Sequence, residues 1–507
     1  MRSNTVFWQL GGLMALVAAL AFFFFFQQSM RLDESQSLWQ TGRSAPEILT
    51  IVAQDVHVPL YHELLHFWRV FVGDSVEASR LLSLIFYMAS IPALYFLGRI
   101  AYGRQAGLFA ATLLAISPFM NWYGSEIRMY TLFTFLVVLN QYFFIRILKS
   151  AEETRERTER AWALYALTAL LGIFTHYFFF LTLAGQALFF VLRRGLFPQG
   201  SFKKFFGILL VLAVMFAPWV WWVFHQGQAN QASPVLQSPT SINFFSAFSQ
   251  FIFGFQTDHL NTIVLSLWPI TVLLGFLALR RTRALQPETL YFMISVFLSM
   301  ALAFIVSVLI EPVFVSRYLI FTVPSLYLLL GALISAYPPR MASFARYAII
   351  GLMLAGLAIE MFSNSTPVKE NYREAAQFLT ENAAAQDIVI LSAPFTVYPV
   401  EYYYRGPAPI ATLPNWDRYA FGPLPAYSAD AMPQEVTDTT KNYQYAWLLL
   451  SYDQGYEEDM RIYFDEHFER VDMREFSPGL ALWVYKIRYD TPLAGEDFVP
   501  GTTTPEQ

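Results

Sequence analysis

The sequence predicts an α-helical polytopic membrane protein with a soluble α/β domain at its C-terminal end. Of its 507 residues, 56% are hydrophobic and only 14% are charged, whereas charged residues make up about a quarter of a soluble protein. Eleven apolar runs approach or reach the ~20 residues that a helix needs to cross a bilayer. After residue 362 these runs stop, and shorter helix and strand patterns take their place.

The predicted spans follow the chain with only short polar connections between most of them. One stretch, 162–192, is apolar except around Thr175, His176 and Tyr177, and it is too long for one span. We therefore divide it into a tight helical hairpin. No small-residue cleavage site follows the first run, which favours a retained span over a cleaved signal peptide. The eleven runs are 7–26, 80–98, 105–120, 127–147, 162–176, 177–192, 205–223, 262–279, 289–310, 317–335 and 345–362.

Lys and Arg in the short loops predict the orientation. With the N-terminus in the cytoplasm, the inner segments carry seventeen Lys and Arg and the outer segments carry six, as the positive-inside rule expects. An odd number of spans then places residues 364–507 outside. We expect a transmembrane domain at 1–363 with a first outer loop at 27–79, an extracytoplasmic α/β domain at 364–490, and a disordered Pro/Thr/Glu-rich tail at 491–507.

The expected elements of the C-terminal domain and of the first outer loop follow from periodicity. In the loop, the segments from Pro46 and from Pro59 each open with proline, which the first turn of a helix tolerates. They predict two interfacial helices that lie flat, with Asp33 and Glu34 beneath or beside them. The C-terminal domain should hold helices at 368–385 and 457–468 and strands at 387–391, 445–451 and 480–487.

Composition excludes several classes of function. No basic tract suggests a nucleic-acid partner. The chain has no cysteine, which rules out disulfides, thiolate metal sites and a cysteine nucleophile.

Two adjacent carboxylates, Asp33 and Glu34, directly follow the first span. Charges beside a span are costly to keep without a use, and a carboxylate there can act as a general base. The pair is also compatible with a divalent cation, Mg²⁺ or Mn²⁺, although nothing requires one. The structural alternative is that both residues cap the first loop helix.

Three arginines begin spans at the same outer level as the acid pair: Arg80, Arg128 and Arg317. Fixed positive charge of this kind suits a departing lipid phosphate. The alternative is that they reach lipid headgroups or pair with Glu126 and Glu311.

Four further side chains have two interpretations each. His57 and His176 are candidate hydrogen-bond donors to a sugar or phosphate, but an isolated histidine near an apolar face is as easily structural. Tyr61 and Tyr130 suit a sugar site, and aromatic belts at the interface explain them equally well.

These residues fall in motifs that, taken together and in order, resemble the bacterial family related to dolichyl-phosphate-mannose protein mannosyltransferases and to the aminoarabinose transferase of lipid A. The family loop usually reads His-Pro-Pro, so Val58 departs from it without removing a functional group. The motifs are Leu32-Asp33-Glu34, His57-Val58-Pro59-Leu60-Tyr61, Leu65-His66-Phe67-Trp68, Ser117-Pro118, Glu126-Ile127-Arg128-Met129-Tyr130, Thr175-His176-Tyr177 and Ser316-Arg317-Tyr318.

The resemblance implies a GT-C fold in a bacterial inner membrane and a polyprenyl-phosphate-linked sugar donor. It also implies an extracytoplasmic acceptor, which would be a lipid, glycan or protein. Asp33 would be the base of an inverting transfer and Glu34 its partner or a metal ligand. Of the residues in these motifs, His57, Tyr61, Glu126, Arg128, Tyr130, His176 and Arg317 would bind substrate, and we add Arg80 from its position.

Two other classes of function stay open on the sequence. His62-Glu63-Leu64-Leu65-His66 is a literal zinc-protease signature, although a third ligand is needed. A transporter or flippase for lipid-linked sugars suits eleven spans, but its charges should lie at mid-bilayer rather than at one face.

Overall fold

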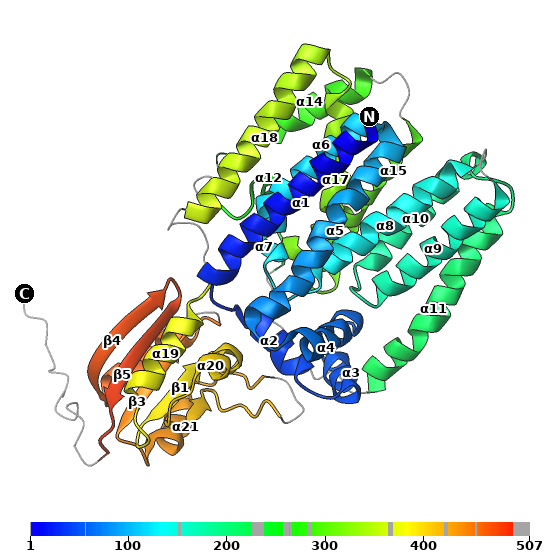
Figure 1. Ribbon diagram of the computed structural model, residues 1–507. Helices are drawn as coiled ribbons and strands as arrows, with labels where there is room; N and C mark the ends of the chain where they lie inside the picture. The colour runs from blue at the N-terminus through cyan, green and yellow to red at the C-terminus, as the bar shows by residue number, and fades with distance from the viewer. Residues whose placement is uncertain are drawn as a thin grey trace, which may run out of the picture. The chain divides into compact units, whose positions relative to one another are not determined.

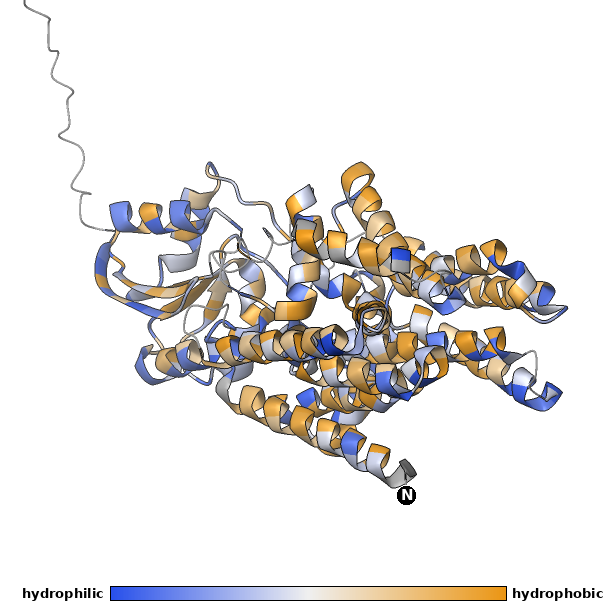
Figure 2. Cartoon of the chain, turned by 90° about the horizontal axis from the view of Figure 1, so that it is seen from above, coloured by the Kyte–Doolittle hydropathy of each residue, from blue (hydrophilic) through white to orange (hydrophobic). Residues whose placement is uncertain are grey.

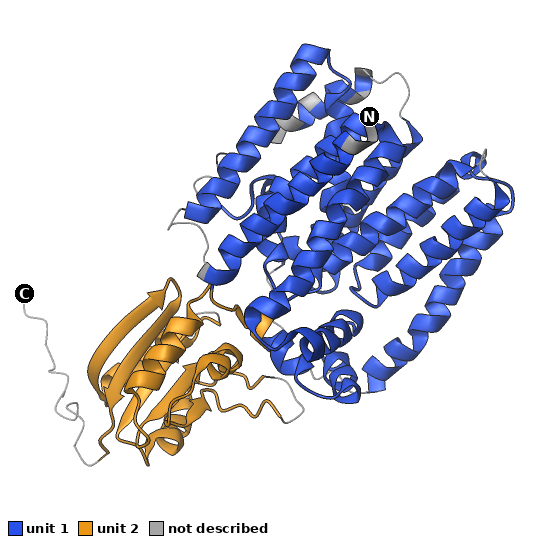
Figure 3. Cartoon of the chain, viewed as in Figure 1, with its two compact units in different colours: residues 1–28, 36–368 blue, residues 29–35, 369–507 orange. Residues whose placement is uncertain are grey.

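The computed structural model (Figure 1) describes residues 2–55, 57–150, 154–225, 238–256, 263, 266, 268–281, 286–362, 369–419, 424–451 and 454–489. The chain forms two compact units (Figure 3). The first comprises residues 1–28 and 36–368, and the second comprises residues 29–35 and 369–507.

The first unit is a bundle of helices on which apolar residues predominate (Figure 2). Within the described residues, seven helical segments are long and apolar enough to cross a membrane, which confirms a multi-pass membrane protein. The helices outside the first loop are α1 (Arg2–Gln27), α5 (Val76–Tyr102), α6 (Arg104–Ile116), α7 (Pro118–Gly124), α8 (Tyr130–Leu148), α9 (Arg155–Ile173), α10 (Phe179–Leu192), η2 (Arg194–Leu196), α11 (Ser201–His225), α12 (Ser241–Phe253), α14 (Trp268–Arg281), α15 (Pro287–Met293), η3 (Ile294–Leu298), α16 (Ser299–Leu309), η4 (Ser316–Thr322), α17 (Val323–Ile334) and α18 (Pro339–Phe362).

Each predicted apolar run overlaps a helix, although part of the run 262–279 lies outside the described residues. The hairpin predicted within 162–192 is present as α9 and α10. The run 105–120, however, is not one helix. It breaks at Ser117, whose Oγ caps the next helix by accepting a hydrogen bond from the Met120 amide at 3.2 Å. Pro118 then occupies the first turn, where its missing N–H costs nothing.

Helix α5 packs closely against α6 and α8. At the α5–α6 crossing, a Cβ on Gly98 would lie 2.6 Å from the Cα of Gly107. Only two glycines allow the backbones to approach so closely.

The first outer loop contains three helices where we predicted two: α2 (Leu32–Thr41), α3 (Ala45–Ala53) and α4 (Leu60–Val72). Helices α3 and α4 confirm the proline-led segments, and Ser44 and Glu47 form a capping box at the start of α3. The unpredicted helix is α2. Its first turn carries Asp33 and Glu34, where carboxylates are favoured by the helix dipole.

The second unit has a five-stranded sheet in the order β2-β1-β3-β5-β4. Strands β1 and β2 and strands β1 and β3 are parallel, while β5 runs antiparallel to β3 and β4. The three predicted strands and both predicted helices are present, whereas β2, β4, α20 and α21 were not predicted. The predicted disordered tail, 491–507, lies outside the described residues. The elements are α19 (Tyr372–Asn382), β1 (Ile388–Ser392), η5 (Pro394–Thr396), α20 (Val397–Tyr403), β2 (Ile410–Thr412), α21 (Met432–Thr440), β3 (Tyr445–Leu450), α22 (Glu457–His467), β4 (Glu469–Ser477) and β5 (Leu480–Lys486).

Candidate active site

A buried arginine lies at the centre of the polar cluster in the first unit. Arg128 occupies the turn between α7 and α8 and is 3% exposed. Its Nη2 lies 2.7 Å from Nε2 of His57, and its Nη1 donates to Oγ of Ser37 at 3.1 Å. A guanidinium can only donate, so His57 Nε2 must be the acceptor and the imidazole is neutral. The cluster therefore holds one fixed positive charge away from bulk water.

Asp55 belongs to the same cluster, and our sequence analysis did not select it. Its Oδ2 lies 3.9 Å from His57 Nε2 and accepts a hydrogen bond from Gln40 at 2.8 Å. The side chain is only 8% exposed, and the hydrogen bond from Gln40 offsets part of the cost of burying its charge. The signal that would have found it is an acid two positions before the motif histidine.

Ser83 on α5 joins two of the predicted residues. Its Oγ lies 3.1 Å from the Tyr61 hydroxyl and donates to the carbonyl of Arg128 at 3.2 Å. Its own carbonyl accepts from Thr131 at 2.8 Å. This small side chain thus fixes the backbone of the Arg128 turn and the Tyr61 ring in one place, a role that no sequence pattern indicated.

His176 lies in the turn between α9 and α10 and packs against aromatic rings of α8. Its ring stacks on Phe133 with centroids 4.6 Å apart and planes 6° apart, and the Tyr130 ring lies 6.4 Å away. The neighbouring Tyr177 donates its hydroxyl proton to the carbonyl of His57 at 3.3 Å. The α9–α10 turn therefore positions the histidine that receives the Arg128 hydrogen bond.

Two buried imidazoles resist protonation here. Burial lowers the pKa of His62 to about 3, and the positive charge of Arg128 adds to the shift. Burial likewise lowers the pKa of His176 to about 3, with a smaller effect from Arg128. Both groups are thus neutral near pH 7, so they favour an anionic ligand only through hydrogen bonds and not through charge.

We expect acid to destabilise the folded first unit through these imidazoles. Between about pH 6.5 and pH 3 the unfolded chain binds protons that the folded site excludes, so stability falls as pH falls through this window. Melting of the detergent-solubilised protein at pH 7.5 and pH 5 measures the effect. His62→Gln should lose less stability on acidification than the wild type, and the exposed control His225→Gln should match the wild type. An unchanged pH dependence in His62→Gln would contradict this.

The remaining predicted binding residues lie in different surroundings. Arg317 is half-buried in η4, with its guanidinium 5.4 Å from the centroid of Tyr318, whose ring lies 5.6 Å from that of His176. The structure thus connects Arg317 with the Arg128 cluster through His176. Arg80 is fully buried and donates to the carbonyls of Phe25 and Gln28 at 3.0 and 3.2 Å, which closes the C-terminal end of α1.

Glu126 is buried, 1% exposed, in the same turn as Arg128. Its backbone amide donates to the carbonyl of Tyr123 at 3.3 Å, which tightens the turn after α7. The buried carboxylate of Glu126 thus lies two residues before Arg128 in the chain.

The acid pair belongs to the second unit, and its two members differ. Glu34 is fully buried. Its Oε2 accepts from the Arg31 amide at 2.9 Å and lies 3.6 Å from Nζ of Lys369, whose side chain is also fully buried. Asp33, in contrast, is half-buried. A carboxylate held by an ammonium is poorly placed to take a proton, whereas its neighbour retains access to solvent.

Neither proposed metal site fits the residues around it. Among the described residues, no group of three His, Asp or Glu side chains is placed to hold an ion. Lys369 already neutralises Glu34 where a divalent cation would have to bind. In the zinc-protease signature, His66 Nδ1 lies 3.0 Å from the carbonyl of Thr41, and His62 stacks on His57.

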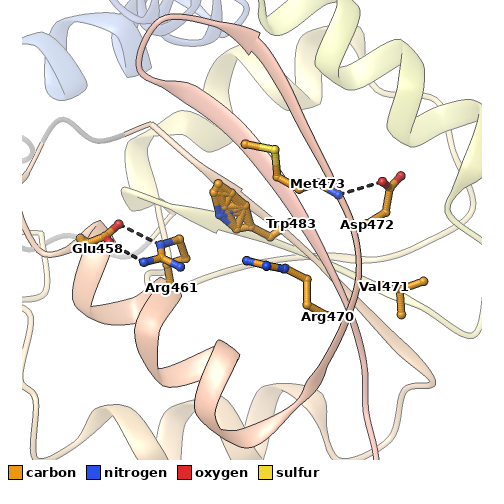
Figure 4. Close-up of a pocket in the computed structure, with 7 residues that line it drawn as sticks. All are labelled: Glu458, Arg461, Arg470, Val471, Asp472, Met473 and Trp483. Carbon is orange, nitrogen blue, oxygen red and sulfur yellow. Dashed lines mark hydrogen bonds and ion pairs between the residues drawn. The ribbon is translucent and has the colours of Figure 1, made fainter.

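A hollow of about 650 Å³ opens between α22, β4 and β5 of the second unit (Figure 4). Its two arginines are engaged with acids: Arg461 pairs with Glu458 at 2.5 Å, and Arg470 lies 3.5 Å from Asp465. Trp483 forms part of the lining. None of the predicted site residues lines this hollow, and its ion pairs tie α22 to the edge of the sheet.

Comparison with known proteins finds a family model that matches one segment of the chain. Residues 57–222 match the family model described as dolichyl-phosphate-mannose-protein mannosyltransferase. The matched segment contains His57, Tyr61, Arg128 and His176. No curated protein matches the sequence.

Solved structures share the fold at low sequence identity. ArnT from Cupriavidus metallidurans, bound to undecaprenyl phosphate, matches with a TM-score of 0.59 and 12% identity over 94% of this chain and 98% of that one. Its apo structure gives 0.58 and 11% over the same shares. An oligosaccharyltransferase from Archaeoglobus fulgidus, in complex with Zn and sulfate, gives 0.49 and 11% over 90% of this chain and 71% of that one. Residues 57–222 thus resemble the dolichyl-phosphate-mannose-protein mannosyltransferase family, and the chain as a whole has the fold of ArnT.

Proposed function

We propose that this enzyme transfers a sugar from a polyprenyl-phosphate donor to a hydroxyl or amine of an extracytoplasmic acceptor, with inversion at the anomeric carbon. The observation that carries the proposal is the buried Arg128, fixed by His57 and Ser37 inside the segment that the family model matches. A preorganised guanidinium in a water-poor site stabilises a phosphate as it gains charge on departure.

Arg128 and Arg317 are the proposed contacts of the donor phosphate. His57, Tyr61, Tyr130 and His176 would supply hydrogen bonds and ring surface to the phosphate or the sugar. The neutral imidazole of His57 accepts from Arg128 at Nε2, and that of His176 accepts from the Phe178 amide at Nδ1. Each ring therefore keeps one N–H that could donate to a phosphate or sugar oxygen. Glu126 would accept from the sugar, while Arg80 would act by holding the end of α1.

Asp33 is the proposed general base. It would take the proton from the acceptor nucleophile on the face opposite the leaving phosphate, and attack would form the new glycosidic bond as the C1–O bond to phosphate breaks. Asp33 lies in the first turn of α2, and Ser37, one turn later in the same helix, receives the Arg128 hydrogen bond. No step of this proposal passes through a metal ion.

The proposed location is a bacterial plasma membrane with the N-terminus in the cytoplasm. The acid pair and the C-terminal unit would then face the extracytoplasmic side, where the C-terminal unit would shape access of the acceptor. The asymmetry of Lys and Arg between inner and outer loops supports this orientation.

Mass spectrometry of cell-envelope lipids, glycans and proteins, with and without the gene, tests the function. We expect one class of molecule to lose the mass of a sugar residue on deletion and to regain it when the gene is restored. An unchanged envelope, together with accumulation of the lipid-linked sugar on one side of the membrane, would favour the transporter alternative instead.

A further inference from the structure

The short segment that carries the acid pair is anchored to the C-terminal unit by several separate contacts. The Met30 amide donates to the Tyr403 hydroxyl at 3.2 Å, and Ser29 Oγ accepts from the Arg373 amide at 3.1 Å. An outer ion pair joins Arg31 to Glu370 at 3.9 Å, with both side chains partly exposed. These contacts come from residues at the far end of the chain, so the position of the acid pair depends on the C-terminal unit.

The innermost of these contacts is the Glu34–Lys369 pair. Both side chains are fully buried and lie 3.6 Å apart. Taking two charges out of water costs several kcal/mol for each ion, and their attraction repays this only when both partners are present. Removing one partner takes away part of the compensation for the remaining buried charge, so a substitution at either residue alone should be costly.

The Glu34–Lys369 ion pair also gives the two neighbouring carboxylates, Asp33 and Glu34, different roles. Two adjacent anions repel each other, and each makes the other harder to ionise. When Lys369 neutralises Glu34, that repulsion is reduced, and the half-buried Asp33 keeps its negative charge more easily. A base must be ionised before it can accept a proton.

We propose that Lys369 is a positioning residue of the transferase: through its buried ion pair with Glu34, it fixes the first turn of α2 and keeps Asp33 ionised. The C-terminal unit would thereby be part of the catalytic machinery rather than an appended domain. This inference rests on the proposed role of Asp33 as base.

Substitutions at Lys369 test the pairing through both stability and transfer. Lys369→Met should lower the melting temperature of the solubilised full-length protein and lower transfer at least tenfold, because Glu34 loses its partner. Lys369→Arg keeps the charge and should restore most of both. The double variant Glu34→Gln, Lys369→Met should restore the melting temperature, since no buried charge remains.

The exposed pair Lys441–Asp438 supplies the matched control, because its atoms lie 2.8 Å apart and its side chains are about half exposed. Lys441→Met should change neither readout, as exposed pairs contribute little. If Lys369→Met melts and transfers like the wild type, the positioning role is wrong. If Asp33→Asn retains full transfer, the failure lies in the proposed base instead, which the Lys369 variants alone would not reveal.

Discussion

The Asp33→Asn variant is expected to insert and fold like the wild type but to transfer sugar about 10²–10⁴-fold more slowly, the range that a positioned general base contributes. Asparagine has nearly the same shape and can still accept a hydrogen bond, but it cannot take up a proton at neutral pH. The measurement is the initial rate at which the envelope molecule that loses its sugar on gene deletion regains it, in cells that produce equal amounts of each variant.

An acid elsewhere in the same loop gives the control. Asp74 follows α4, and its side chain is 77% exposed and paired with Arg69 at 2.8 Å. Asp74→Asn should transfer at the wild-type rate. A wild-type rate in Asp33→Asn would end its assignment as base and return the acid pair to the simpler role of starting α2.

The equivalent substitution at the neighbouring position, Glu34→Gln, distinguishes the roles of the two acids. Glu34→Gln removes the charge that Lys369 neutralises, so it should lower stability more than Asp33→Asn does. Two adjacent residues of the same chemical type would then give different defects: one in catalysis and one mainly in folding. Equal defects in both would show that the pair acts as a unit.

Hydropathy was sufficient to predict the seven described helices that are long and apolar enough to cross a membrane, because crossing a bilayer requires only length and apolar composition. It could not predict α2, since the segment Leu32–Thr41 is mostly polar and its apolar residues, Leu32, Leu38 and Trp39, form no sustained helical stripe. The helix forms because its side chains are held by partners elsewhere in the chain, as Ser37 is by Arg128.

Strand β4 was missed for a related reason. Its residues from Glu469 to Glu475 are all exposed, and five of these seven are charged. Charges on an edge strand discourage pairing with another chain, but they remove the alternation of apolar and polar residues by which a strand is recognised. Its partner β5, buried along almost its whole length, was predicted.

The motifs selected most of the candidate site residues from the sequence. The structure adds the residues that contact and position them. Ser83 and Lys369 were not selected, because each acts through a partner distant in sequence or through its backbone. Such contacts have no local pattern. Arg80, Arg128 and Arg317 looked equivalent in the sequence, yet Arg80 contacts backbone carbonyls while Arg128 contacts side chains of the cluster.

The second large effect is expected at Arg128. Arg128→Gln should weaken binding of undecaprenyl phosphate to the purified protein by about 100-fold, because removing a buried, hydrogen-bonded charge from a phosphate site costs 2–5 kcal/mol or more, taken here as about 2.7. Arg128→Lys keeps the positive charge but loses the two-pronged guanidinium that contacts both His57 and Ser37. Its affinity for undecaprenyl phosphate should therefore lie between those of the wild type and Arg128→Gln. Arg43 stacks on Trp39 at 4.3 Å in the segment that also carries Ser37 and His57, and it gives the control variant Arg43→Gln.

The sharper readout at Arg128 is a ratio of two affinities. Undecaprenol has the same tail as undecaprenyl phosphate and lacks the phosphate, so the preference for the phosphate over the alcohol isolates the contribution of charge. Arg128→Gln should lose most of this preference while its affinity for the alcohol stays close to that of the wild type. A variant that loses affinity for both ligands equally has lost its fold, which its melting temperature would show. A stable variant with the wild-type preference would instead place the phosphate contact at Arg317 and leave Arg128 as the residue that orients His57.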